Sequence, residues 1–123
     1  MAILDTLYQY FRRDKKPLLV RPFLLDGAIT IHGIIVLNEE LREDKRELFI
    51  TIFHELLHLD RGYIGREWVN RSVQYQRAKE KEIEEDARRL YEDNVVVLET
   101  LKNYLMETEL INQEEYDRRY KNL

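Results

Sequence analysis

Three residues whose types suit metal chemistry, His54, Glu55 and His58, stand in the order His-Glu-Leu-Leu-His. On an α-helix, residues four apart lie one turn above each other, so both imidazoles can face a single metal ion. Glu55 lies about 100° further round the helix, where it can handle a metal-bound water without acting as a ligand. Zinc suits two imidazoles and a carboxylate with one position left open to water. The pattern therefore predicts a catalytic zinc site with His54 and His58 as ligands.

The residues that flank this motif predict a helix buried in the centre of a domain. Only one arc of its circumference is polar, and that arc holds the motif together with Glu47 and Thr51. Burying two histidines and a glutamate is unfavourable unless they bind something. The alternative is a chance pair of histidines satisfied by hydrogen bonds, but the spacing, the intervening glutamate and the burial favour metal binding. The apolar positions are Leu48, Phe49, Ile50, Ile52, Phe53, Leu56, Leu57 and Leu59.

The composition narrows the class of protein. At 123 residues the chain is long enough for one core, so we expect a single domain over residues 1–123. The net charge of −4 comes from interspersed acids and bases, which predicts no binding to nucleic acid or to an anionic membrane. The chain has no cysteine, which excludes disulfides, thiolate ligands and a cysteine nucleophile. Without a membrane-span or signal-peptide pattern we expect a cytoplasmic protein. The high content of charged residues weakly favours a thermophilic source.

Three short strands are predicted before the central helix. Residues 18–20 read as a strand that Pro22 confines to the edge of a sheet. Residues 28–31 and 34–37 flank His32-Gly33, which is typical of a hairpin. We therefore expect an α+β fold in which a small three-stranded sheet packs on a helical bundle around the buried motif helix.

Helix boundaries are predicted from caps and stops. Asp44 and Glu47 form a capping-box pattern that begins the central helix, and Gly62 suits its C-terminal stop. Residues 61–71 contain two glycines and Trp68 and are expected to form a loop. Further helices are predicted over residues 5–12, from the cap Ser72 to about Asp93, from about Val95 to Glu107, and from the cap Asn112 through residues 112–123.

A third metal ligand has to come from outside the motif helix, since two histidines rarely hold catalytic zinc alone. No histidine follows His58, and Arg61 and Ile64 stand where a metzincin would have Gly and His. A carboxylate is therefore expected, and the acidic segment 79–87 is its obvious source.

Several acids of that segment compete for the role. Glu84 and Glu80 flank the buried face of the predicted helix, whereas Glu82 and Glu85 lie towards the opposite side. We favour Glu84, with Glu80, Glu82 and Asp86 as alternatives. The buried face is marked by Ile83, Ala87, Leu90 and Tyr91.

The chain resembles the ImmA/IrrE-type metallopeptidases over about residues 28–91. The similar elements are a strand ending in Asn, an Arg-x-x-Phe lead-in and the metal-binding helix, followed by a glutamate helix of the form Glu-x-Glu-Ala-Asn-x-Phe. Here they read Ile35-Val36-Leu37-Asn38 with Leu41, Arg46-Glu47-Leu48-Phe49, His54-Glu55-Leu56-Leu57-His58 and Glu84-Glu85-Asp86-Ala87-Arg88-Arg89-Leu90.

This resemblance implies a zincin-like fold of the gluzincin class, closest in size to minimal gluzincins (minigluzincins), with Glu84 as the third ligand. Leu57 replaces the usual Gly before the second histidine, and Arg88 replaces an Asn or Asp that often supports a metal-binding histidine. Glu82 and Asp86 also fit a Glu-x-x-x-Asp form, so an alignment in which Glu82 is the metal ligand is a second possibility. The Leu-Met-Pro that often follows is missing.

The implied activity is that of a hydrolase, a zinc-dependent metalloendopeptidase acting on a peptide or protein substrate. Zinc held by His54, His58 and Glu84 would lower the pKa of its bound water, and Glu55 would take the proton and pass it to the leaving amine. A strand of the 28–37 region can bind an extended substrate as an added strand. The alternative is a zinc-binding regulatory or interaction protein with little general proteolytic activity.

Other residues carry weaker expectations. His32 and Tyr63 are candidates for the donor that stabilises the oxyanion. A histidine in such a turn is more often simply solvated, and a tyrosine after a helix stop more often has a packing role. Trp68 is expected to be a hydrophobic anchor rather than a substrate platform. For residues 112–123 we expect docking on helices far from the zinc, and the competing hypothesis is autoinhibition, in which they lie over the cleft and restrain activity.

Overall fold

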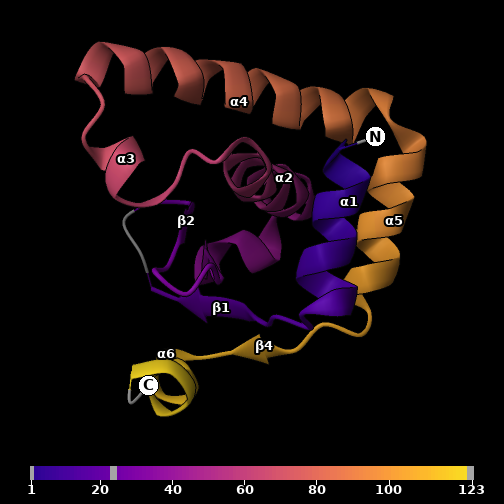
Figure 1. Ribbon diagram of the computed structural model, residues 1–123. Coiled ribbons are helices and arrows are strands. Elements are labelled where there is room, and N and C mark those ends of the chain that lie inside the picture. Colours follow the sequence, from indigo (N-terminus) through magenta and orange to yellow (C-terminus); the bar gives the residue numbers. More distant parts are fainter. Residues whose placement is uncertain (1, 23–24, 122–123) are drawn as a thin grey trace.

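Helix α2 (Lys45–Arg61), which carries the motif, lies at the centre of the fold (Figure 1). We describe a computed structural model of the chain, covering residues 2–22 and 25–121. The predicted boundaries of α2 are confirmed. The Asp44 side chain accepts a hydrogen bond from the Glu47 N–H at 3.2 Å, and Gly62 ends the helix at a φ of 73°, a left-handed conformation that glycine adopts without strain.

A small sheet lies on one side of α2, and the α+β prediction is confirmed. The described strands are β1 (Leu18–Arg21), β2 (Gly27–Ile29), β3 (Ile35–Asn38) and β4 (Leu110–Ile111), in the order β2-β3-β1-β4. Strand β1 pairs in parallel with both β3 and β4, and β2 pairs antiparallel with β3 as the predicted hairpin.

Two sheet predictions are wrong. The sheet has four strands among the described residues rather than three, because β4 forms in a segment expected to be a connection. Two residues are too few to show the alternation that identifies a strand. Strand β1 is interior rather than at an edge, because Pro22 follows its last residue and so removes no hydrogen bond from the ladder.

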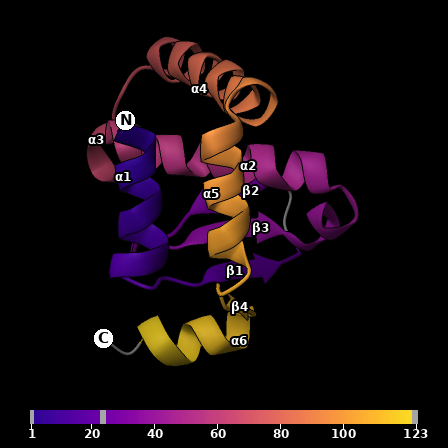
Figure 2. The ribbon, with the colours of Figure 1, turned by 90° about the vertical axis from the view of Figure 1, so that its right-hand side faces the viewer.

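Helices surround α2 on its other sides. Helix α4 (Val73–Asp93) crosses it on the side away from the sheet, and α1 (Ala2–Tyr8) packs beside α5 (Val95–Leu105) (Figure 2). The predicted cap is confirmed at Ser72, whose hydroxyl accepts from the Tyr75 N–H at 3.1 Å. None of the described helices is both long and apolar enough to cross a membrane.

Several shorter helical pieces depart from the predictions. Helix α1 begins at Ala2 rather than near Asp5 and continues as a π-helical turn, Gln9–Arg13. A 3₁₀ turn, Glu39–Glu43, follows β3. The segment 61–71 contains α3 (Gly65–Val69), a helix too short for a periodic pattern. The chain closes with α6 (Gln113–Tyr116) and a π-helical turn, Asp117–Lys121.

Strands β1 and β3 are buried on both faces of the sheet. One face packs against α2, where Leu18 and Leu37 join Ile52 and Leu56 in the main core. The opposite face is covered by the C-terminal residues. The buried residues of this second, smaller core are Leu19, Ile34, Val36, Ile111 and Tyr116. Because side chains alternate across a strand, neighbouring residues of β1 and β3 serve different cores.

Candidate metal centre

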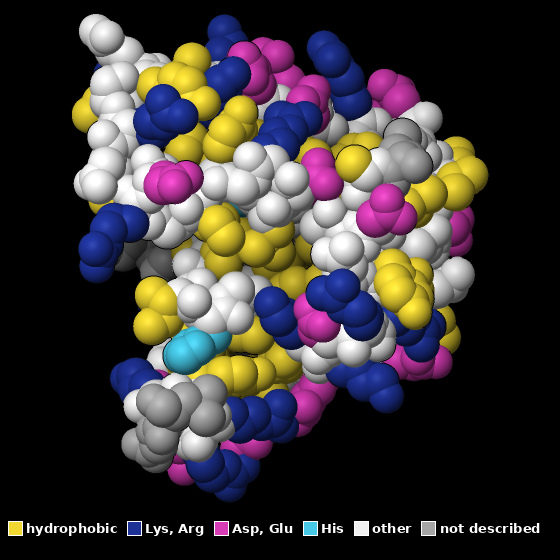
Figure 3. Space-filling view, viewed as in Figure 1, with side chains coloured by type: hydrophobic (Ala, Val, Ile, Leu, Met, Phe, Trp, Pro, Cys, Tyr) yellow, Lys and Arg dark blue, Asp and Glu magenta, His cyan; other side chains and the backbone are white. Residues whose placement is uncertain are grey.

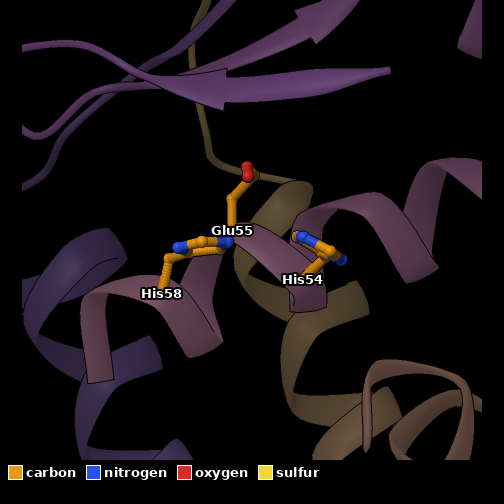
Figure 4. Close-up of side chains that lie close together, drawn as sticks. All are labelled: His54, Glu55 and His58. Carbon is orange, nitrogen blue, oxygen red and sulfur yellow. The ribbon is translucent and has the colours of Figure 1, made fainter. Parts of the chain in front are cut away.

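The three motif residues meet at one point on α2. One potential ligand atom from each of His54, Glu55 and His58 lies within 4.8 Å of the others, so this group could hold a metal ion. Figure 4 shows the two imidazoles on either side of Glu55, whose carboxylate points towards the strands. His58 and Glu55 are buried at 7% and 6% exposure. The helical spacing therefore produces the predicted convergence.

The end of α2 orients the His58 ring. The Nδ1–H of His58 donates to the Tyr63 carbonyl at 2.8 Å, because the left-handed Gly62 turns the chain back over the last helical turn. A carbonyl only accepts, so Nδ1 keeps its proton, and Nε2 is the nitrogen of His58 that could bind a metal ion once it loses its own proton. Trp68 of α3 meets the same ring edge-on at 5.5 Å, and Tyr63 stacks on Trp68 at 5.1 Å.

Helix α4 brings two carboxylates to the histidines. The Glu80 carboxylate lies between them, with Oε1 at 2.7 Å from His58 Nε2 and Oε2 at 2.9 Å from His54 Nε2. Glu84, one turn further along, contacts the other nitrogen of His54, with Oε2 at 2.8 Å from Nδ1. The arrangement therefore favours Glu80 over the predicted Glu84, since Glu80 faces the two nitrogens that a shared metal would use.

The other candidate acids lie away from the histidines. Glu82 pairs with Lys79 at 3.3 Å, and Asp86 accepts from Arg61 at 2.5 Å. Behind Glu84, Arg88 contacts the free carboxylate oxygen at 2.9 Å and also donates to Glu47 at 3.2 Å. Arg88 is thus the group that holds Glu84 against His54 from the side away from the site.

The charges of the site are strongly coupled. Burial opposes protonation of His54, but its hydrogen bonds to Glu80 and Glu84 and the charge of Glu55 outweigh it and raise the His54 pKa to about 9. Burial disfavours the Glu80 carboxylate, yet its bonds to both histidines lower the Glu80 pKa to about 2. Two protonated imidazoles that share the Glu80 carboxylate form an arrangement in which a divalent cation could take the place of the two Nε2 protons.

Glu55 differs from the other acids of the site. Burial is the main cause that raises its pKa above the usual range, and the two histidines oppose this. In the described part of the chain its Oε2 is buried without a hydrogen-bond partner. An unpaired buried carboxylate oxygen is unfavourable to folding and suits a group that accepts a proton during a reaction. Two imidazoles and the neighbouring carboxylates thus form a set of donors that could hold a metal ion.

The site opens into a cleft of about 580 Å³. Figure 3 shows the molecule hollowed between its upper and lower parts. The floor is formed by the motif residues and Glu80, and the two walls come from the β2–β3 hairpin and from the α3 region. The wall residues include Leu25, Ile29 and Ile31 on one side and Tyr63, Ile64, Trp68 and Val69 on the other. Tyr63 therefore faces the cleft, whereas the predicted donor His32 is not among the residues that line it.

Strand β2 presents a free edge to this cleft. The Asn38 N–H donates to the Asp26 carbonyl and the Thr30 N–H to the Ile34 carbonyl, so alternate residues of β2 bond inward. In such a ladder the backbone groups of Gly27 and Ile29 point away from β3. Gly27 also lets α2 approach closely, because a β-carbon there would lie 2.7 Å from Thr51 Cγ2 and 3.4 Å from Glu55 Cγ.

Replacing Gly27 by alanine should therefore disturb both the fold and the site. We expect the free energy of unfolding to fall by about 1–3 kcal/mol, the usual range for overpacking a core, when it is measured by denaturant titration. Adding Thr51→Ser removes the nearest methyl and should restore part of the loss. A Gly27→Ala variant as stable as the original protein would show that the strand moves aside freely.

From the sequence, Glu80 was an alternative to Glu84 as the third ligand, and Gly27 was not identified as a site residue. A signal existed for Glu80, which flanks the buried face of its helix as Glu84 does. The role of Gly27 depends on how closely two elements approach, which no local pattern reports.

Comparisons with known proteins do not identify a family for this chain. No protein-family model matches the chain, no curated protein matches it, and no solved structure matches it. The likeness to ImmA/IrrE-type peptidases therefore stays a prediction, and the functional argument rests on the geometry of the cleft itself.

Proposed function

We propose that this chain is a zinc-dependent endopeptidase. The observation that carries the proposal is the Glu80 carboxylate lying against Nε2 of both His54 and His58, beside the buried and unpartnered Glu55. A structural zinc site closes all four positions with protein ligands and has no use for a free base.

The metal ligands in this proposal are His54, His58 and Glu80. Their other contacts support that role, because Glu84 accepts from His54 Nδ1 and the Tyr63 carbonyl from His58 Nδ1. Such outer partners fix the tautomer and orientation of a metal-binding imidazole. Glu84 therefore supports a ligand rather than serving as one.

Glu55 is the proposed general base. A zinc ion held by these ligands supplies Lewis-acid chemistry, acidifying water and polarising a carbonyl. Glu55 accepts the proton of the attacking water and delivers it to the leaving amine. Its raised pKa, which burial causes, makes the carboxylate a better proton acceptor than an exposed glutamate.

The cleft supports an extended peptide as the substrate. The outward backbone of Gly27 and Ile29 offers hydrogen bonds to an added strand. Both walls carry exposed apolar side chains, so we expect large apolar residues near the scissile bond. These are Leu25, Ile31, Ile64 and Val69, with exposures of 64%, 96%, 39% and 70%. None of the described lining residues is Lys or Arg, the usual partners of a terminal carboxylate, and this favours cleavage within a chain.

The proposal is tested by metal content and hydrolysis of a mixed peptide library. We expect about one zinc per chain, loss of cleavage on chelation and recovery when zinc is returned. Trp68, the single tryptophan of the chain, lies 5.5 Å from His58, so its fluorescence should report metal binding directly. Bound zinc without any cleavage would instead favour a zinc-binding regulatory or interaction protein.

A further inference from the structure

In the C-terminal segment (residues 110–121), β4 extends the sheet at its edge, and the helical residues 113–121 lie on the face of the sheet opposite α2 (Figure 1). None of its described residues lines the cleft. The autoinhibition hypothesis is therefore not what this arrangement supports, and docking on helices is also wrong, because the segment packs on the sheet.

The segment is attached to the sheet by several kinds of contact. Strand β4 pairs in parallel with β1, and the Arg21 guanidinium donates to the Gln113 side chain at 2.9 Å. Ile111 and Tyr116 are buried in the cluster that includes Ile34, and Tyr120 packs against that cluster. Apolar burial of this kind is what holds a short terminal helix in place.

Two tyrosines of the segment reach the turn of the β2–β3 hairpin. The His32 ring lies 5.4 Å from the ring of Tyr120 and 6.2 Å from that of Tyr116, and the two tyrosine rings are 5.0 Å apart. The chain neighbours of His32 are Ile31 and Gly33, and both line the cleft. The C-terminal segment thus contacts one wall of the cleft from behind.

This wall has little support of its own. Strand β2 is three residues long, lies at the edge of the sheet and, among the described residues, pairs with β3 alone. On one side it rests on α2 at Gly27. On the other side, Ala28 packs on the cluster that contains Tyr116 and Ile111.

We propose that the C-terminal segment positions the substrate-binding wall of the cleft, with Tyr120 and Tyr116 as positioning residues that act through His32. The proposal rests on the proposed function for its kinetic consequence. The metal-binding candidates His54, His58 and Glu80 lie on α2 and α4, away from these contacts. Loosening the segment should therefore weaken binding of an extended peptide and leave metal binding intact.

The test compares Tyr120→Ala with Arg118→Ala. Arg118 is 76% exposed at its side chain and, among the described residues, forms its ion pair with Glu115 three residues earlier, so it controls for a change in the segment without loss of the hairpin contact. We expect Tyr120→Ala to raise the KM for an extended peptide about tenfold and to change kcat less than about twofold. Acetohydroxamate, which needs only the metal, should bind both variants equally, whereas a peptide hydroxamate should bind Tyr120→Ala more weakly.

Amide hydrogen exchange tests the same inference without activity or metal. The Thr30 N–H bonds to the Ile34 carbonyl at 2.9 Å and should exchange about tenfold faster in Tyr120→Ala than in the control. His32→Ala removes the contact from the other side without replacing any residue of the buried cluster, and should reproduce the effect if Tyr120→Ala fails to fold. Unchanged Thr30 exchange and unchanged peptide affinity in His32→Ala would overturn the inference, whereas absent acetohydroxamate binding alone would count against the proposed metal centre.

Discussion

Replacing Glu55 by glutamine should lower peptide hydrolysis by about 10²–10⁴-fold, the usual range for loss of a general acid–base group. Glutamine keeps the size of the side chain and cannot accept the proton of the attacking water. Because Glu55 Oε2 has no hydrogen-bond partner among the described residues, the substitution breaks no bond there. We expect kcat to fall while zinc content and the unfolding temperature are maintained.

The matched control for this variant is Glu85→Gln, an exposed acid on the outer side of α4. It should cleave at the original rate. Undiminished hydrolysis by Glu55→Gln would mean that another group activates the water, or that the activity came from a contaminant.

Replacing Glu80 by alanine should have the largest effect on metal binding outside the two histidines. Removing a direct ligand should reduce zinc affinity more than removing an outer partner, for which losses are about 10–100-fold. We therefore expect Glu84→Ala to weaken zinc binding by about that range and Glu80→Ala to weaken it further. Competition with a chromophoric chelator measures both affinities on one scale.

Glu82→Ala controls for the loss of an acid from the same helix. Its side chain is 55% exposed and pairs with Lys79, so zinc affinity should not change. The opposite ranking, with Glu84→Ala losing more zinc than Glu80→Ala, would restore the ligand that the motif comparison predicts and would make Glu80 the supporting residue.

The motif helix could be predicted closely because its determinants are local. Its start depends on Asp44 and its stop on Gly62, and both lie within one turn of the helix. The hairpin and the cap of α4 at Ser72 were predictable for the same reason. Metal-binding spacing within one helix is likewise a local property, which is why His54, Glu55 and His58 were identified together.

The third carboxylate could not be chosen in the same way. Glu80 and Glu84 are four residues apart, so they differ by only about 40° around the helix axis. Which of them reaches the Nε2 atoms depends on how α4 crosses α2, a property of packing between two distant helices. Strand β4 is also a product of packing, since it exists because β1 offers it an edge.

The pairing of β4 with β1 sets an order for folding. Arg21 and Gln113 are 92 residues apart in the chain and in contact in the sheet, so this closure is among the slowest kinds of contact to form. During synthesis the motif helix, α4 and the hairpin can associate before residue 110 has been made, because folding proceeds from the N-terminal side. A nascent chain of that length would hold its metal ligands without the segment behind the hairpin. Under the proposed function, the chain would bind its metal ion before it could bind an extended peptide. Other nascent chains nearby would then not be cleaved during its synthesis.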